Sequence, residues 1–312
     1  MADVSVVIPT RNRAAFADRA VASALAQRDL VVQVIVVDDG STDDTSQRAK
    51  RWEAAGVEFV PGPPGGVSDA RNRGVSRARA PWVAFLDDDD LWAPDKLASQ
   101  LSLLRSAPEA RWCCTGCVWI DESDRIIGSA APPTTLGAEQ LLARNAVPGG
   151  GSTMVVDREL VEALGGFDVG LSLFEDWDAW IRFALAAPGV TLARPSVAFR
   201  IWRSTTASAG DRLTPAWEAV AARHSAAAAQ RGVEPDRRAL VEFEAFRRLR
   251  AAQYQAAGDA YRRLDKRYLA VVVEHAGPLW TWLQMQRSRR NVPPAWHSEA
   301  MAWLSGAPLG SG

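Results

Sequence analysis

Four consecutive aspartates, Asp87 to Asp90, are the residues with the clearest chemical potential. They follow the apolar run 82–86, which is typical of a buried strand. Like charges side by side repel one another, whereas Mg²⁺ or Mn²⁺ prefers carboxylate oxygen and can bridge to the phosphates of a ligand. The cluster therefore indicates a metal-assisted phosphate site. The plainer interpretation is that Asp89 or Asp90 caps a helix that continues through Lys96.

Polar residues also follow two other apolar runs. Asp38 and Asp39 end the β-branched run 34–37, and Pro9, Thr10 and Arg11 follow the run 4–8. In open α/β sheets, ligands bind outside the carboxyl ends of the strands. Three polar strand ends therefore predict one shared crevice.

A further acidic pair, Glu175 and Asp176, lies among Phe174, Trp177 and Trp180. Aromatic walls exclude water and raise the pKa of a carboxylate, which suits a general base. The alternative is that both acids occupy the first turn of an amphipathic helix, where acidic groups are favourable.

The chain order predicts the elements that position these groups. Strands at 4–8, 34–37, 57–60 and 82–86 alternate with helical patterns at 14–27, 42–55 and 68–80. This alternation predicts an α/β, Rossmann-like fold with a mostly parallel sheet and helices on both faces. No Gly-x-Gly-x-x-Gly follows the first strand, so the usual dinucleotide fingerprint is absent from the sequence.

Six ordered segments together resemble the motifs of family-2 glycosyltransferases, the inverting enzymes of GT-A fold. The segments are Val6–Arg13, Val37–Asp43, Ala70–Gly74, Phe85–Asp90, Gly165–Asp168 and Glu175–Arg182. The resemblance spans roughly residues 1–205, and motifs in this order are far more specific than any single one. Residues 206–312 carry no recognisable motif and are expected to form a helical C-terminal extension.

The resemblance implies a role for each matching residue. The nucleotide-sugar site would be formed by Pro9, Thr10, Arg11, Asp39, Arg71, Asp87 and Asp88. Asp39 would accept a hydrogen bond from the base, Asp87 would lie towards the ribose and the metal water, and Asp89 would bind Mn²⁺ or Mg²⁺ directly. Asp88 could equally be a structural cap or a residue that holds a neighbouring ligand residue in place. Asp176 would be the general base.

One segment departs from the family pattern. Many relatives carry an aromatic-Arg-x-His run whose His helps to bind the metal, and here the run is Phe199–Arg203, with Trp202 at the His position. An indole cannot ligate a cation, so metal affinity is expected to be low without the donor. Arg200 and Arg203 are candidates for supplying positive charge to the diphosphate, or are surface charges.

The implied activity is metal-dependent transfer of a sugar from a nucleoside diphosphate, of the UDP, TDP or GDP type, to a hydroxyl or other nucleophile. The acceptor is left open between a glycan, a lipid-linked sugar, a peptide and a small metabolite. A nucleotidyltransferase that makes the sugar nucleotide is a second class, although no Gly-rich loop with a Lys or Arg follows the first strand. A non-catalytic sugar-nucleotide binder is a third.

Composition limits the remaining classes. With 312 residues and 47% hydrophobic content, the chain can bury one sizeable core plus an appendage. We expect a nucleotide-sugar half at 1–110, an acceptor half at 111–210 and the helical extension at 211–312. The net charge of −1 gives no case for binding nucleic acid.

Cys113, Cys114 and Cys117 contain a Cys-x-x-Cys spacing, but no second ligand pair follows, so buried core thiols are expected rather than zinc. Clustered thiols suit a reducing cytoplasm. No signal peptide and no charge-free run of 18 apolar residues is seen, so we expect a cytoplasmic protein without a transmembrane segment. The tryptophans near the end leave an acceptor site, a homodimer seam, a peripheral membrane contact and ordinary packing open. They are Trp280, Trp282, Trp296 and Trp303.

Overall fold

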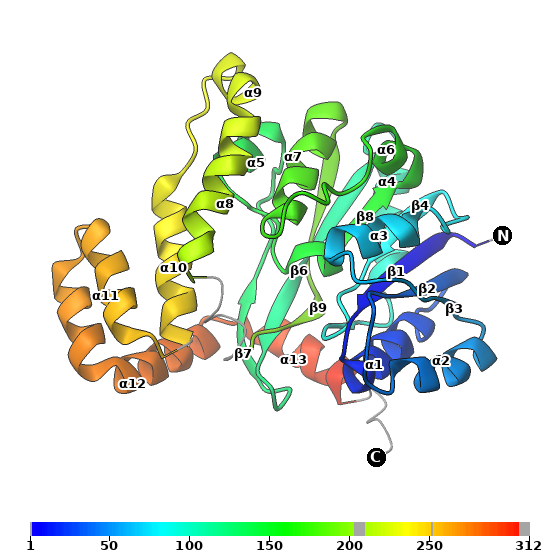
Figure 1. The fold of residues 1–312 in the computed structure, drawn as a ribbon, viewed down its shortest axis with the longest axis horizontal. Coiled ribbons are helices and arrows are strands. Elements are labelled where there is room, and N and C mark those ends of the chain that lie inside the picture. The colour runs from blue at the N-terminus through cyan, green and yellow to red at the C-terminus, as the bar shows by residue number, and fades with distance from the viewer. Residues whose placement is uncertain (1, 203–209, 251, 306–312) are drawn as a thin grey trace.

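The computed structural model describes residues 2–202, 210–250 and 252–305. Within these ranges, nine strands form one sheet in the order β3-β2-β1-β4-β8-β6-β9-β5, with β7 paired to β6 (Figure 1). The strands are β1 (Val4–Thr10), β2 (Val32–Asp38), β3 (Glu58–Val60), β4 (Trp82–Phe85), β5 (Leu91–Trp92), β6 (Trp112–Ile120), β7 (Ile126–Ala130), β8 (Met154–Asp157) and β9 (Gly189–Arg200).

The first half of the sheet is parallel, as predicted. β1 lies between β2 and β4 and is parallel to both, and β3 extends the sheet beyond β2. Successive side chains of β1 alternate between two hydrophobic cores, with Val6 and Ile8 in one and Val7 in the other. Burial on both faces explains why these strands are continuous apolar runs.

The second half of the sheet is mixed, which the sequence did not reveal. β8 runs antiparallel to both of its neighbours, β4 and β6, and β5 runs antiparallel to β9. β6 and β7 are joined by residues 121–125 only, a link too short for the crossover that a parallel pair needs, so they form a hairpin. β6 and β9 are parallel to each other.

Helices cover both faces of the sheet, as predicted (Figure 1). One core is closed by α1 (Ala14–Leu25), α2 (Thr45–Ala54) and α4 (Lys96–Ser106). The other is closed by α3 (Val67–Val75), α5 (Ala138–Ala143), α6 (Arg158–Ala163), α7 (Glu175–Ala186), α8 (Gly210–Arg223) and α9 (Ser225–Gln230), with the 3₁₀ turn η1 (Gly150–Thr153) before β8.

α3 lies unusually close to the sheet because of Gly74. A Cβ atom at Gly74 would come within 2.2 Å of the Val7 side chain in β1. Any side chain there would push the helix outward and displace Arg71, which lies on the same helix. The glycine of the Ala-Arg-Asn-x-Gly motif therefore has a packing role.

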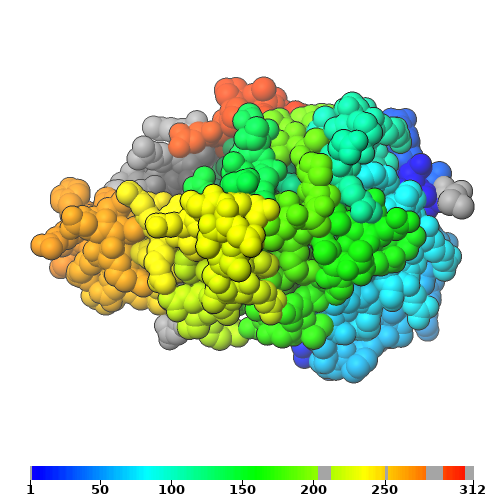
Figure 2. Space-filling view, turned by 90° about the horizontal axis from the view of Figure 1, so that it is seen from above, coloured from blue at the N-terminus to red at the C-terminus, as the bar shows by residue number. Residues whose placement is uncertain are grey.

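The C-terminal extension contains α10 (Arg237–Arg250), α11 (Tyr254–Arg263), α12 (Arg267–Arg290) and α13 (Pro294–Leu304). α10 to α12 stand beside the β6–β7 end of the sheet, far from the N-terminus (Figures 1 and 2). α13 returns to the sheet, where Trp296 lies against Gly116 and Trp303 packs on the β6–β7–β9 core. Ordinary packing thus accounts for these two tryptophans, whereas the side chains of Trp280 and Trp282 lie outside the described residues.

Two further expectations concern thiols and membranes. The three cysteines lie on β6. They are buried in the two hydrophobic cores and form no disulfide, as expected of small core thiols. Across the described ranges, the structure contains no helix with both the length and the apolar character needed to cross a bilayer.

Candidate active site

A cavity of about 600 Å³ opens at the carboxyl ends of β1, β2 and β4. Its lining includes every residue predicted for the nucleotide and the metal, namely Pro9, Thr10, Arg11, Asp39, Arg71, Asp87, Asp88 and Asp89. The shared crevice expected from three polar strand ends is therefore present in the structure. We call it the first cavity.

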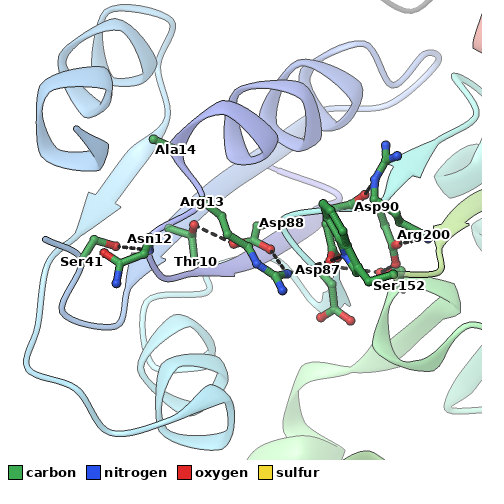
Figure 3. A network of polar contacts seen from close by, with 12 residues as sticks. Thr10, Asn12, Arg13, Ala14, Ser41, Asp87, Asp88, Asp90, Ser152 and Arg200 are labelled. Carbon is green, nitrogen blue, oxygen red and sulfur yellow. Dashed lines mark hydrogen bonds and ion pairs between the residues drawn. The ribbon is translucent and has the colours of Figure 1, made fainter. Parts of the chain in front are cut away.

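Asp88 is held by residues from the end of β1. Thr10 Oγ1 donates to Asp88 Oδ2 at 2.8 Å, and Arg13 Nη1 donates to Asp88 Oδ1 at 3.2 Å (Figure 3). Burial and the neighbouring charge of Asp89 raise the pKa of Asp88 to about 7 despite these contacts. Asp88 therefore faces the β1 loop as a supporting group.

Asp89 has two donors on one oxygen. Arg13 Nη1 lies 2.7 Å and Trp202 Nε1 2.6 Å from Asp89 Oδ2. The Arg13 guanidinium also lies 5.6 Å from the centre of the Trp202 ring. The residue at the position of the family histidine thus orients the proposed metal ligand by a hydrogen bond. Sequence reasoning assigned no role to Arg13, although it lies inside the first motif.

Asp90 is fully enclosed and does not cap a helix. Ser152 Oγ donates to Asp90 Oδ2 at 2.6 Å, and the backbone N–H of Arg200 donates to Asp90 Oδ1 at 2.8 Å (Figure 3). The next helix, α4, begins at Lys96 after Asp95, so the capping interpretation of Asp89 and Asp90 is wrong. Asp90 instead ties the acidic segment to β9.

Arg200 lines the first cavity, and oxygen atoms of the protein hold its guanidinium. Its guanidinium donates to Asp124 Oδ1 at 2.6 Å, to the Asp121 carbonyl at 2.8 Å and to the Asp89 carbonyl at 3.0 Å. These contacts fix the end of β9 against the acidic loop. Arg203, the other candidate, lies outside the described residues.

Arg71 connects the first cavity to α7. Its guanidinium donates to Asp87 Oδ1 at 2.8 Å and to Glu175 Oε1 at 3.0 Å, and its side chain is only 4% exposed. Although burial opposes the charge, the two carboxylates keep the pKa of Arg71 above its ordinary value. Arg71 is therefore a fixed cation between the two acidic motifs.

Asp39 faces the loop that precedes α3. Its carboxylate accepts from the backbone N–H of Gly65 at 2.6 Å and of Gly66 at 3.1 Å, and Arg11 lies 3.8 Å away. The Arg11 side chain is 52% exposed, so it can move towards a ligand. The contact between Asp39 and a base stays a prediction.

Asp176 lies in a second cavity of about 470 Å³, beside the first. Both motif acids occupy the first turn of α7, as the helical alternative predicted, yet they face different cavities: Glu175 lines the first and Asp176 the second. Burial, reinforced by the adjacent Glu175, raises the pKa of Asp176 to about 7. A carboxylate with that pKa suits a general base near neutral pH.

The two cavities share a wall made of Phe199, Ile201, Phe243 and Phe246. The two phenylalanines belong to α10, which also contributes Arg247 to the first cavity. Sequence reasoning missed these three residues because the extension carries no motif. Their spacing on one helical face was the available signal, although it equally describes a core stripe.

The first cavity offers oxygen ligands to a divalent cation. Asp87 and Asp89 supply hard oxygen ligands to one cavity, which matches the preference of Mg²⁺ and Mn²⁺. In the parts of the chain that the structure describes, no group of three His, Cys, Asp or Glu side chains converges to hold a metal ion. The residues fit a cation that takes its remaining ligands from diphosphate oxygens and water.

Comparisons with known proteins bear on the family and the fold of this chain. An uncharacterized glycosyltransferase of Rickettsia prowazekii is 28% identical over 189 residues, which are 58% of each chain. This chain therefore matches little more than half the length of that relative. S. aureus TarS 1-349 in complex with UDP-GlcNAc has a TM-score of 0.57 at 15% identity, covering 92% of this chain and 91% of that one.

The mannosyltransferase PcManGT from Pyrobaculum calidifontis, in complex with GDP-Man and Mn²⁺, has a TM-score of 0.56 at 20% identity, covering 93% and 86% of the two chains. At such identities, both structures support the GT-A fold alone. The model of the family described as glycosyl transferase family 2 matches residues 5–165, more than half of the chain. The motifs, the fold and this match agree, and the chain belongs to glycosyl transferase family 2.

Proposed function

We propose that the protein is a metal-dependent, inverting glycosyltransferase that moves a sugar from a nucleoside diphosphate to an acceptor hydroxyl by single displacement. One observation carries the proposal: the cavity holding Asp87 and Asp89 adjoins a second cavity holding Asp176. Carboxylates suited to a cation and a carboxylate suited to a base thus lie on two sides of one shared wall.

On the donor side, Thr10, Arg11 and Asp39 would hold the nucleoside, and Asp87 and Asp89 would hold Mn²⁺ or Mg²⁺. Such a cation, when bound, supplies the positive charge that stabilises the departing diphosphate. Arg13, next to Asp89, adds a protein cation on the same side. Arg71 holds the Asp87 carboxylate in place by a hydrogen bond.

On the acceptor side, Asp176 would take the proton of the acceptor hydroxyl as its oxygen attacks the anomeric carbon. The bond from that carbon to the diphosphate oxygen breaks on the opposite face, and its electron pair leaves with the diphosphate. One attack on the face opposite the leaving group inverts the anomeric centre. The raised pKa of Asp176 makes its carboxylate a stronger proton acceptor than an ordinary aspartate.

The identity of the donor and the cellular location belong to the same proposal. The structural neighbours were solved with UDP-GlcNAc and with GDP-Man and Mn²⁺, which favours testing uridine and guanosine nucleotides beside TDP. We place the protein in the cytoplasm, with peripheral contact to a membrane as one route to a lipid-linked acceptor. The division at residues 110 and 210 also stays a prediction.

Calorimetric titration with UDP, TDP and GDP, each with and without Mn²⁺, tests the proposal. We expect one nucleotide to bind wild type in a Mn²⁺-dependent way and the dependence to be lost in Asp89→Ala. Glu109→Ala, which removes an exposed acid after α4, is the matched control and should behave as wild type. Absence of metal-dependent binding for all three nucleotides would overturn the proposed mechanism.

A further inference from the structure

The second cavity is enclosed by aromatic rings from several elements. They are Trp119 of β6, Phe174 directly before α7, Trp177 of α7, Phe199 of β9, Trp217 of α8, and Phe243 and Phe246 of α10. Val147, Ile201 and Leu240 add aliphatic surface. Rings that surround a cavity from several sides differ from a single flat platform, on which a sugar can stack one face while its edges stay in water.

The rings contact one another in two groups. Trp217 stacks on Trp177 at 6.0 Å between ring centres, Trp177 meets Phe174 at 5.9 Å, and Phe174 meets Phe243 at 6.3 Å. Trp119 meets Phe246 at 6.1 Å. The helical extension therefore completes the cavity, because β6, α7 and α8 alone would leave it open on the α10 side.

The part of the chain that the structure describes brings few polar side chains to this cavity. Among the described residues, its polar lining besides Asp176 consists of Arg144 and Asn145, and both are exposed. A sugar ring carries several hydroxyls, and each one that is buried without a partner loses its hydrogen bonds to water. The interior therefore favours an apolar group, with one hydroxyl directed to Asp176.

The backbone conformation of Phe174 is a second unusual feature of this cavity. Phe174 has a φ of 59°, in the left-handed region that non-glycine residues rarely adopt, directly before the two acids of α7. Such strain persists only where the surroundings hold it, and it gathers at functional sites. Here it places an aromatic ring and the Asp176 carboxylate on the same cavity.

Apolar surface is also left uncovered. Phe243 is 42% and Phe246 36% exposed although both line the shared wall of the two cavities. Large rings gathered at a concave site and still exposed are typical of a ligand-binding surface. A ligand with an apolar body would cover them while its hydroxyl lies at the junction with the first cavity.

We propose that the acceptor is amphipathic: an aryl or alkyl body fills the second cavity and a hydroxyl at its polar end meets Asp176. This inference rests on the proposed function, since it names the acceptor class of the same site. It also gives the helical extension a role, because α10 supplies the wall that recognises the apolar body.

The test compares two probes that share one sugar. Octyl β-glucoside, kept below its micelle-forming concentration, and methyl β-glucoside are titrated against the full chain by calorimetry. We expect the octyl compound to bind at least tenfold more tightly, because burial of the extra methylenes is favourable. Equal affinities would overturn the inference.

Two variants locate the binding. Ala239→Trp fills the second cavity and Leu240→Asn makes it polar; neither residue lines the first cavity. We expect a loss of at least tenfold in octyl glucoside affinity in the variants that retain nucleotide binding, and none in the control Ala222→Trp, on the exposed side of α8. Unchanged octyl glucoside affinity in both cavity variants would also overturn the inference.

Titration of UDP, TDP and GDP with Mn²⁺ on the same samples distinguishes a failure of the proposed function from a failure of the inferred acceptor class. Failure of all three nucleotides to bind wild type would overturn the proposed function. Nucleotide binding without a preference for octyl glucoside would leave that function standing and reject only the amphipathic acceptor.

Discussion

At the scale of single residues, the acidic segment is stable because every aspartate in it has a partner that donates hydrogen bonds. Asp87 pairs with Arg71, Asp88 and Asp89 share Arg13, and Asp90 accepts from Ser152 and a backbone N–H. These partners offset the mutual repulsion of four adjacent carboxylates. Asp87 and Asp89 remain in contact with the cavity, where a cation would meet them.

Trp202 offers a test of metal affinity at one position. Its N–H holds Asp89, but an indole supplies no metal ligand, whereas an imidazole does. Trp202→His should therefore raise the affinity for Mn²⁺ by on the order of tenfold. Spectroscopic titration of free Mn²⁺ measures this affinity directly and does not depend on enzyme turnover.

Trp202→Phe serves as the control for that experiment, since it keeps an aromatic ring and removes the N–H without adding a ligand. It should show no gain in Mn²⁺ affinity. A gain of equal size in both variants would mean that release of Asp89, rather than a new ligand, is responsible.

The raised pKa of Asp176 predicts that the rate of donor turnover depends on pH. Its pKa is raised to about 7, so the carboxylate is protonated, and unable to accept a proton, in an increasing fraction of molecules below that pH. The rate of donor turnover, measured as release of nucleoside diphosphate, should fall about tenfold per pH unit below about pH 7. Direct assays between pH 5 and 9 at saturating Mn²⁺ would measure this limb.

Asp176→Asn is the matching variant. Turnover should fall by roughly 10²- to 10⁴-fold and lose its acidic limb, because the amide cannot accept the proton. Nucleotide affinity should stay close to that of wild type, since Asp176 lies in the second cavity. An unchanged pH profile in this variant would assign the base to another group.

At the scale of elements, the N-terminal half of the fold was predictable. The β-branched runs gave β1 and β2, and the alternation with helices gave a parallel sheet whose strand ends form a cavity. The mixed half was not predictable, because the order of β8, β6 and β9 depends on tertiary pairing between distant segments. Local pattern gives the existence of a strand but not its neighbours.

The same distinction applies to the site. Asp87, Asp89 and Asp176 could be named because their motifs are local in sequence. The contributions of Phe243, Phe246 and Arg13 could not, since each depends on where another element lies. An amphipathic helix such as α10 presents the same pattern whether it faces a core or a ligand.

A buried charge network joins α7 to α8 and the residue that follows it, and we expect this network to stabilise the fold. Asp178 is fully buried and accepts from Arg182 at 2.9 Å and Arg223 at 3.1 Å, with His224 2.9 Å away. Removal of one partner of a buried charge network leaves the others uncompensated. Asp178→Ala should lower the free energy of unfolding by about 3–5 kcal/mol in urea titrations.

The pH dependence of that network has a defined sign. Burial opposes ionisation of Asp178, but the hydrogen bond from His224 and the charge of Arg182 outweigh it and hold the pKa at about 2. A lowered folded pKa means stability that is present above the unfolded value near 3.8 and is lost as the pH falls towards 2. The stability of the Asp178→Ala variant should lack this decrease at acidic pH. Asp259→Ala, which removes an exposed ion pair with Arg262 on α11, is the control and should keep the decrease.

At the scale of the whole molecule, the two ends differ in charge and in packing. Residues 237–290 carry twelve Arg or Lys against five Asp or Glu, although the chain as a whole has a net charge of −1. This basic unit lies at the opposite end of the molecule from the first strands (Figure 2). Its own core is small, consisting of Leu249, Ala257 and Val273 with two tyrosines against them.

That arrangement predicts unequal local stability, which amide hydrogen exchange can measure. β1 and β2 lie between two extensive cores and should exchange slowest, whereas α11, with few buried apolar contacts, should open at a far lower free energy. α10 differs from α11 because Phe243 and Phe246 line both cavities.

Nucleotide with Mn²⁺ should therefore slow exchange in α10, and octyl β-glucoside should slow it further, while α11 changes little. The expected ratio of exchange rates with and without ligands is at least tenfold for α10. Equal protection of α10 and α11 would mean that the extension responds as one rigid unit. Protection confined to β1, β2 and β4 would mean that α10 takes no part in binding, and the cavity wall assigned to it would then have to be only structural.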